Sequence, residues 1–134
     1  MKRYPAYQIT RDSQFDLAEY YRLGIGVPTC PTEAFYWYSI CAVNKKIRCH
    51  RRVDAQCMVG ICFFTGIGVE QDFQEATYWY KIAAKNEHAK SQYLLSRCYR
   101  QGYGVNISEK LADYWLAKAE ENGYHEQSNN NDCI

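Results

Sequence analysis

Cysteine and histidine are the residues of this sequence whose chemistry would be most specific, because thiolates and imidazoles are preferred ligands of zinc. The 134-residue chain contains seven cysteines and three histidines. Cys49, His50 and Cys57 form the most suggestive group. Their separations are not the two to four residues (between cysteines) or about three to five residues (between histidines) that are typical of a closed tetrahedral site. We therefore expect neither a metal site nor a cofactor.

Nucleophilic catalysis would need a thiol or hydroxyl beside a base and an orienting group. The histidines fall near loops or towards the C-terminal end, without a repeated partner: His50, His88 and His125. The helical carboxylates fall at capping or solvent-facing positions: Glu75, Glu109 and Asp113. No acid and base are paired in this pattern. We therefore expect a protein that is not an enzyme.

A threefold internal repeat provides the elements that position these residues. The motif Gly-x-Gly-Val begins at Gly24, Gly66 and Gly102, with spacings of 42 and 36 residues. An alanine and a tryptophan follow each motif at constant distances: Ala34 and Trp37, Ala76 and Trp79, Ala112 and Trp115. Self-similarity at this period is the signature of a helical-repeat protein. Three units are therefore in register, and the first has six extra residues.

The first helix of each unit is predicted upstream of the glycine motif. An aliphatic, a small and an aromatic residue recur at spacings that share one helix face. They are Leu17, Ala18 and Tyr21; Val59, Gly60 and Phe63; and Leu95, Ser96 and Tyr99. The first glycine of the motif ends the helix, because glycine takes the left-handed conformation of a helix C-terminus without steric cost.

The second helix of each unit is predicted to begin just after Cys30, Asp72 or Ser108. Asp72 and Ser108 are good N-capping residues, and Pro31 suits the first turn because its missing N–H group costs nothing there. The expected buried face comprises Ala34, Trp37, Tyr38 and Cys41; Ala76, Trp79, Tyr80 and Ala83; and Ala112, Trp115, Leu116 and Ala119. Small residues let the helices approach, and the rings fill the space between them.

Stacked hairpins are expected, because one hairpin of about 36 residues cannot bury its apolar face alone. We predict an all-α fold, an α/α superhelical solenoid of three helix-turn-helix repeats at about 13–54, 55–90 and 91–123. Residues 1–12 are expected to cover the N-terminal repeat. Residues 124–134 contain an asparagine run and are expected to form a disordered tail.

The repeat resembles the Sel-like repeat, a relative of the tetratricopeptide repeat. The second copy, AQCMVGICFFTGIGVEQDFQEATYWYKIAAKNE, matches the family pattern closely, and the resemblance covers about residues 13–123. It implies a scaffold or adaptor that holds other proteins together, with no catalytic machinery. The partner would be a protein or peptide whose identity the resemblance does not give.

A cysteine-rich secreted branch of this family is an alternative, and it has been linked to β-lactam binding or hydrolysis. In that branch, a cysteine near the end of one second helix pairs with another near the start of the next first helix. Here Cys41 and Cys57 are each one residue out of that register. We therefore favour reduced thiols over a disulfide framework.

A partner surface is expected on the first helices, opposite their buried face. The stripe consists of Phe15, Glu19 and Arg22; Cys57, Ile61 and Phe64; and Tyr93, Arg97 and Arg100. In related helical repeats this stripe lines the concave groove. Its apolar centre and arginines suit a peptide with a hydrophobic anchor and acidic neighbours. The alternative is that Ile61 and Phe64 only pack against a neighbouring helix or a terminal segment.

Charge and hydropathy argue against other partners. The net charge of +1 gives no general reason to expect nucleic acid. One basic cluster runs from Lys45 to Arg52, and it is either a nuclear-import or polyanion patch or a solvated extension of the preceding second helix and its loop. No apolar run resembles a signal peptide or a membrane span, so we expect a cytoplasmic protein without membrane insertion.

Overall fold

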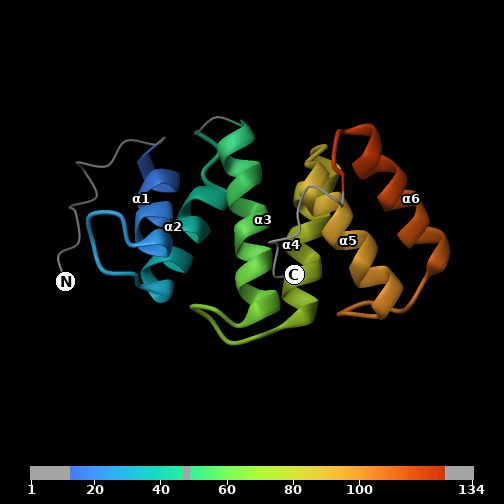
Figure 1. Ribbon diagram of the computed structural model, residues 1–134, viewed down its shortest axis with the longest axis horizontal. Helices are drawn as coiled ribbons and strands as arrows, with labels where there is room; N and C mark the ends of the chain where they lie inside the picture. The colour runs from blue at the N-terminus through green and yellow to red at the C-terminus, as the bar shows by residue number, and fades with distance from the viewer. Residues whose placement is uncertain (1–12, 47–48, 126–134) are drawn as a thin grey trace.

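The computed structural model describes residues 13–46 and 49–125, and within these ranges the chain forms six helices and no strand. The helices are α1 (Ser13–Leu23), α2 (Pro31–Val43), α3 (Cys49–Thr65), α4 (Phe73–Lys85), α5 (Ala89–Gln101) and α6 (Glu109–Glu121). They follow one another along the long axis of the molecule, and each packs chiefly against its neighbours in the chain (Figure 1). The predicted all-α repeat solenoid is confirmed. The expected N-terminal cover and most of the expected tail lie outside the described residues.

The starts of the second helices follow the predicted capping chemistry. The Asp72 side chain accepts hydrogen bonds from the backbone N–H groups of Gln74 and Glu75, at 3.0 and 3.1 Å. The Ser108 hydroxyl accepts one from the N–H of Leu111, at 3.2 Å. Cys30 makes no side-chain cap, and Pro31 occupies the first turn instead. Three local solutions therefore start the same helix.

The turn between the two helices of each repeat is closed by one recurrent backbone bond. The N–H of the N-cap residue donates to the carbonyl of the aromatic residue in the last turn of the preceding helix: Cys30 to Tyr21 (2.9 Å), Asp72 to Phe63 (2.8 Å) and Ser108 to Tyr99 (2.9 Å). The first glycine of each motif has a φ between +74° and +78°, which favours glycine over other residues. The turn therefore has the same geometry in all three repeats.

The recurrent glutamine of the first helices links neighbouring repeats. Gln56 and Gln92 donate from Nε2 to the carbonyls of Ala42 and Ala84, at 3.2 and 3.0 Å. These alanines lie near the ends of α2 and α4, where carbonyls lack partners within the helix. The glutamines therefore satisfy buried helix ends and fix each first helix against the preceding second helix.

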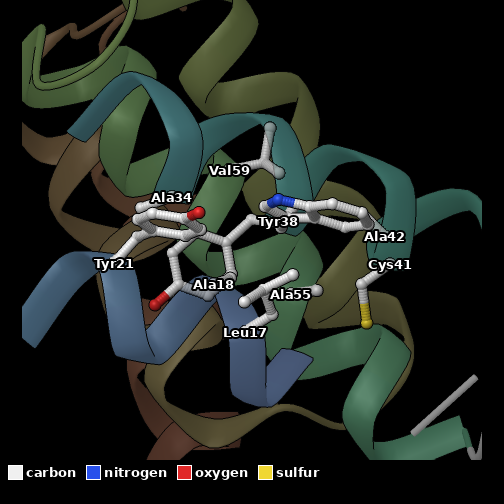
Figure 2. Close-up of a cluster of buried hydrophobic side chains, with 10 residues drawn as sticks. Leu17, Ala18, Tyr21, Ala34, Tyr38, Cys41, Ala42, Ala55 and Val59 are labelled. Carbon is white, nitrogen blue, oxygen red and sulfur yellow. The ribbon is translucent and has the colours of Figure 1, made fainter. Parts of the chain in front are cut away.

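Two hydrophobic clusters fill the space between the repeats. The first lies between α1, α2 and α3 (Figure 2), and the second between α3, α4 and α5. Tyr38 and Tyr80 are fully buried at equivalent positions of the two clusters. At Gly60, an added Cβ atom would lie 2.6 Å from the Tyr80 ring, so the small position permits the ring to approach. Most of the predicted core is confirmed, but Phe63, Trp79, Tyr99, Trp115 and Leu116 are only partly buried.

The six-residue insertion lengthens α3 rather than α2. Helix α2 ends at Val43, and the Asn44 side chain turns the chain by accepting a hydrogen bond from the N–H of Lys46, at 3.0 Å. Helix α3 already begins at Cys49. The solvated alternative for the basic cluster is therefore correct in part: Lys45 and Lys46 are exposed in the turn after α2, but α2 itself is not extended, because Asn44 and this turn end it first.

Candidate protein-binding surface

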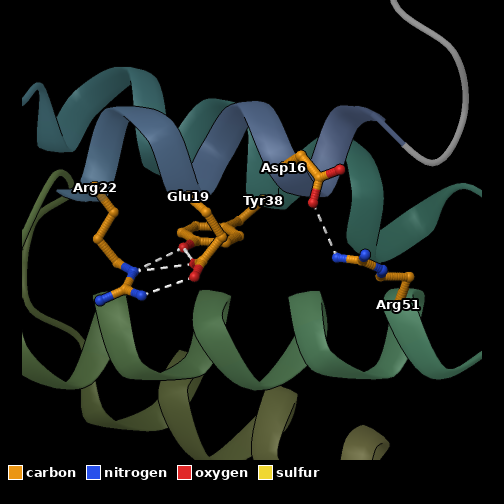
Figure 3. Close-up of polar contacts among 5 residues, drawn as sticks. All are labelled: Asp16, Glu19, Arg22, Tyr38 and Arg51. Carbon is orange, nitrogen blue, oxygen red and sulfur yellow. Dashed lines mark hydrogen bonds and ion pairs between the residues drawn. The ribbon is translucent and has the colours of Figure 1, made fainter. Parts of the chain in front are cut away.

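A polar network occupies the α1 part of the predicted stripe. The Arg22 guanidinium donates to both carboxylate oxygens of Glu19, at 2.8 and 3.0 Å, and from Nε to the Tyr38 hydroxyl at 3.0 Å. That hydroxyl, which comes from α2, donates to Glu19 (Figure 3). Burial would raise the pKa of Glu19, but the bonds from Arg22 and Tyr38 hold it below its ordinary value. Glu19 is therefore a carboxylate whose charge Arg22 neutralises.

Phe15, the remaining stripe residue of α1, is covered from two sides. Its ring meets the Tyr38 ring edge-on, with centroids 5.7 Å apart. The Arg51 guanidinium lies 5.1 Å from the Phe15 centroid and forms an ion pair with Asp16 at 3.1 Å (Figure 3). Arg51 of the basic cluster therefore joins α3 to α1, whereas Lys45 is exposed.

The stripe residues of α3 have three different environments. Cys57 is only 2% exposed and belongs to the second core cluster, so its side chain does not reach the surface. Phe64 packs against Phe73 and Tyr103, with centroid distances of 4.9 and 5.0 Å. Ile61 is partly buried. The packing alternative thus describes Phe64, and Ile61 is the α3 residue best placed to contact a ligand.

The three stripe residues of α5 are Tyr93, Arg97 and Arg100, and they differ in how far the fold already satisfies them. Tyr93 stacks on Tyr124, with centroids 4.6 Å apart. Arg100 forms ion pairs with Glu109 and Asp113 of α6, at 2.9 and 3.1 Å. Arg97 is partly buried, and it makes no hydrogen bond or ion pair within residues 13–46 and 49–125. Arg97 is therefore the stripe residue that offers an uncompensated positive charge.

A cavity of about 350 Å³ between α1, α2 and α3 was not anticipated from the sequence. The stripe residues Arg22 and Ile61 line it, together with Pro31, Met58 and Ile67. The lining residues are mostly apolar. The stripe therefore borders a space into which an apolar group could enter.

The tyrosine network of the first repeat is replaced by apolar residues in the second. One repeat on, Tyr80 is equivalent to Tyr38, but Ile61 and Phe64 stand in place of Glu19 and Arg22. The buried Tyr80 hydroxyl has no hydrogen-bond partner among the described residues. Burial, followed by the nearby thiols, raises the pKa of Tyr80 far above its ordinary value. The same ring is thus satisfied in one repeat and unsatisfied in the next.

Removal of the Tyr38 hydroxyl and removal of the Tyr80 hydroxyl should affect the free energy of unfolding differently. Tyr38→Phe should lower the free energy of unfolding by about 2 kcal/mol, because a buried bond to a charged group is lost. Tyr80→Phe should leave it unchanged or raise it by up to about 1 kcal/mol, because an unpaired buried polar atom is removed. Urea denaturation of both variants measures the difference, and equal losses would contradict the assigned roles.

His88 links α5 to α3 through a partly buried polar cluster that no sequence pattern revealed. Its Nε2 atom lies 3.0 Å from Asp54 Oδ1, and its Nδ1 atom lies 2.8 Å from Ser91 Oγ. Burial lowers the pKa of His88, but hydrogen bonds with Asp54 and Cys57 outweigh it and raise the pKa to about 9. When the ring is protonated, both of its N–H groups donate, one to Asp54 and one to the Ser91 hydroxyl. The Ser91 backbone N–H, 3.3 Å from Nδ1, can donate to this atom only when the ring is neutral.

The order serine, histidine, aspartate in this cluster resembles a nucleophilic triad. Ser91 is fully buried, at 0% exposure, so its hydroxyl is not open to a substrate. The histidine also lies at the N-terminal cap of α5. The cluster therefore has a structural explanation as the link between two first helices.

Cys30, Cys57, Cys62 and Cys98 are free thiols, and the Cys41 thiol donates a hydrogen bond to the Arg51 carbonyl oxygen, at 3.8 Å. Burial raises the pKa of Cys62 to about 11 and also raises that of Cys98. These two thiols therefore stay protonated and poorly nucleophilic near neutral pH.

Among the described side chains, no three His, Cys, Asp or Glu residues lie close enough together to hold a metal ion. Within the same part of the chain, no helix is both long enough and apolar enough to cross a membrane.

Comparison with known proteins identifies the repeat. The family model described as Sel1 repeat matches residues 11–40, 53–88 and 89–124. A crystal structure of a protective antigen present in uropathogenic Escherichia coli strains, which displays an SLR fold, is similar with a TM-score of 0.78 and 29% identity. A Sel1 repeat protein from Oxalobacter formigenes is similar with a TM-score of 0.77 and 28% identity.

These similarities cover 85% and 89% of this chain, but only 23% of the antigen and 46% of the Oxalobacter protein. The chain thus spans less than half the length of either protein. No curated protein sequence matches the chain significantly.

Proposed function

The chain belongs to the Sel1 repeat family, and on that premise we propose that it is a scaffold that binds a segment of a partner protein along the stripe of α1, α3 and α5. Sel1 repeat proteins generally mediate protein–protein interaction, and their fold is typically a non-catalytic scaffold. The stripe would form the concave groove of the solenoid. The free, buried thiols of Cys57, Cys62 and Cys98 favour a reducing compartment such as the cytoplasm for this adaptor.

The charge state of the stripe supports this proposal and indicates the kind of segment that would bind. Glu19 and Arg22 neutralise each other, and Arg100 is paired with α6. Arg97 keeps a positive charge without a partner among the described residues. Ile61 holds the position in the second repeat that Arg97 holds in the third, and it offers an apolar contact to a bound segment. An extended segment with an apolar side chain and neighbouring carboxylates would satisfy both positions.

A peptide-display selection tests this function and does not require the partner to be identified first. The full chain is expected to enrich segments that combine acidic residues with a large apolar residue. Arg97→Glu should weaken binding of the enriched segments by about tenfold or more, because it replaces attraction with repulsion. Affinities measured by fluorescence anisotropy for the wild type and the variant give the ratio.

Lys110→Glu is the matched control, because it makes the same charge reversal at an exposed position in the first turn of α6, a helix that contributes no residue to the stripe. It should leave the enriched segments and their affinities unchanged. Enrichment of the same segments by all three proteins with equal affinity would overturn the groove assignment, and so would a selection with no enrichment.

A further inference from the structure

The cavity between the first two repeats has a second junction in the same chain to which it can be compared. One repeat on, Arg22, Pro31 and Ile67 of the cavity wall correspond to Phe64, Phe73 and Tyr103. Those three rings pack together between the second and third repeats, with centroid distances of 4.9, 5.0 and 5.0 Å. The chain therefore fills with its own aromatic rings the space that corresponds to the cavity.

The first junction lacks all three rings, and the walls that surround the missing volume remain apolar. Met58 and Ile61 from α3 line it, with Pro31 and Ala34 from α2. A volume of about 350 Å³ is in the range of pockets that hold small ligands. Because apolar walls gain free energy when they exclude water, the entry of an aromatic or bulky aliphatic side chain would be favourable.

The charges near the cavity indicate which residues should flank the inserted side chain in the partner segment. Among the described residues that line the cavity, Arg22 is the charged one, and Glu19 already neutralises it. The next stripe position along the solenoid from Ile61 is Arg97, whose charge has no partner among the described residues. A carboxylate next to the anchoring side chain would complement Arg97, whereas a basic neighbour would be repelled.

We infer that the cavity bounded by Arg22, Pro31, Met58, Ile61 and Ile67 is an anchor pocket that receives one aromatic side chain of an acidic partner segment. This inference rests on the proposed function and adds to it the position and chemistry of the anchor. The occupant takes the place that Phe64, Phe73 and Tyr103 fill in the second junction. A single bulky residue beside carboxylates is therefore the recognition element.

Methionine-methyl NMR tests the pocket directly. The chain has two methionines, Met1 and Met58, so a sample of the full chain labelled with ¹³C at the methionine methyls reports from inside the pocket through Met58. The probes are an acidic pentapeptide with a central phenylalanine, its twin with a central alanine, and toluene. The phenylalanine peptide and toluene should shift the Met58 methyl signal, and the alanine twin should bind about tenfold more weakly or worse.

Ile67→Tyr places in the first junction the residue type that stands at position 103, and it should fill the pocket and abolish the Met58 shift. Ile25→Tyr is the matched control, because Ile25 is the equivalent turn residue of the first repeat, is 53% exposed and does not line the pocket. This control should keep the shift. Equal thermal stability of the two variants would exclude misfolding as the cause of a lost signal.

The possible failures are distinguishable. If the peptides bind with equal affinity or leave Met58 unmoved, the anchor pocket is overturned and the proposed function stands. If toluene shifts Met58 but neither peptide binds, the pocket takes small apolar molecules and its assignment to a partner segment is overturned. If light scattering shows that the wild type is a dimer and Ile67→Tyr a monomer, the occupant is a second copy and the inference is overturned.

Discussion

Replacing Gly104 with alanine is expected to lower the free energy of unfolding by about 3 kcal/mol or more, because two separate costs add. Gly104 has a φ of +71°, where an alanine is strained by about 1 kcal/mol. An added Cβ atom would also lie 2.3 Å from the carbonyl oxygen of Phe73 in the preceding repeat. Backbone atoms cannot move aside as a flexible side chain can, so the two repeats would have to separate.

Gly26→Ala is the matched control, since Gly26 holds the same position in the first repeat. Its φ is +73°, but an added Cβ atom would meet nothing within 4 Å. This variant should lose only the conformational part, about 1 kcal/mol. Gly68→Ala should behave like Gly104→Ala, because its Cβ atom would lie 2.4 Å from the Pro31 carbonyl oxygen. Urea denaturation of the three variants measures the losses, and equal values would refute the stacking contact.

The second glycine of the motif has a role that the sequence alone could not reveal. The first glycine could be predicted, because ending a helix is a local event with a local conformational requirement. The second glycine is required by a contact with the preceding repeat, and no local pattern contains that distance. A comparison of the repeats shows only that the position is invariant within the chain, not which atom approaches it.

The candidate surface was predictable in its register but not in its electrostatics. Helical periodicity correctly placed Glu19 and Arg22 on one face of α1, and it identified Tyr38 as buried. It could not show that these three groups bond to one another, because their contact depends on how α1 lies on α2. As a result, most of the predicted stripe residues proved to be paired, packed or buried within the fold, and Arg97 is the charged one without a partner among the described residues.

One signal for the pocket is present in the sequence. The replacement of Phe64, Phe73 and Tyr103 by non-aromatic residues at the equivalent positions of the first junction could be read from the aligned repeats. The signal becomes informative only when the structure shows that these three positions converge. Positions 22, 31 and 67 come from three separate segments of the chain.

His88 has no repeated partner in the sequence. In the structure it pairs with Asp54, and this pairing makes the stability of the protein depend on pH. Asp54 belongs to the part of α3 that precedes the repeat pattern, so no periodic signal related the two residues. The pairing is a tertiary contact between the start of α5 and the first half of α3, with 3.0 Å between Nε2 and the carboxylate. The His88 side chain is 21% exposed and the Asp54 side chain 43%, so solvent screens this contact substantially from the carboxylate side.

The protein is expected to lose stability as the pH rises from about 6.5 to 9. The pKa of His88 is about 9 in the folded state and 6.5 for an unperturbed histidine. The folded state therefore binds a proton that the unfolded state releases, so the contribution is fully present below pH 6.5 and is lost as the pH rises through 9. Its size is at most on the order of 3 kcal/mol. Urea denaturation at a series of pH values measures it.

Two variants separate this effect from other titrations. His88→Gln should have a lower free energy of unfolding than the wild type at pH 6.5, and the difference should shrink towards pH 9. Asp54→Asn should also reduce the dependence of the free energy of unfolding on pH between 6.5 and 9, because the carboxylate that holds the proton on His88 is gone. The buried Cys62 thiol, with a pKa of about 11, reduces stability only at higher pH, since its unfolded value is 9.0. If the wild type and His88→Gln have parallel pH profiles between 6.5 and 9, the proton is not held by this cluster, and the link between α3 and α5 is made by the neutral ring.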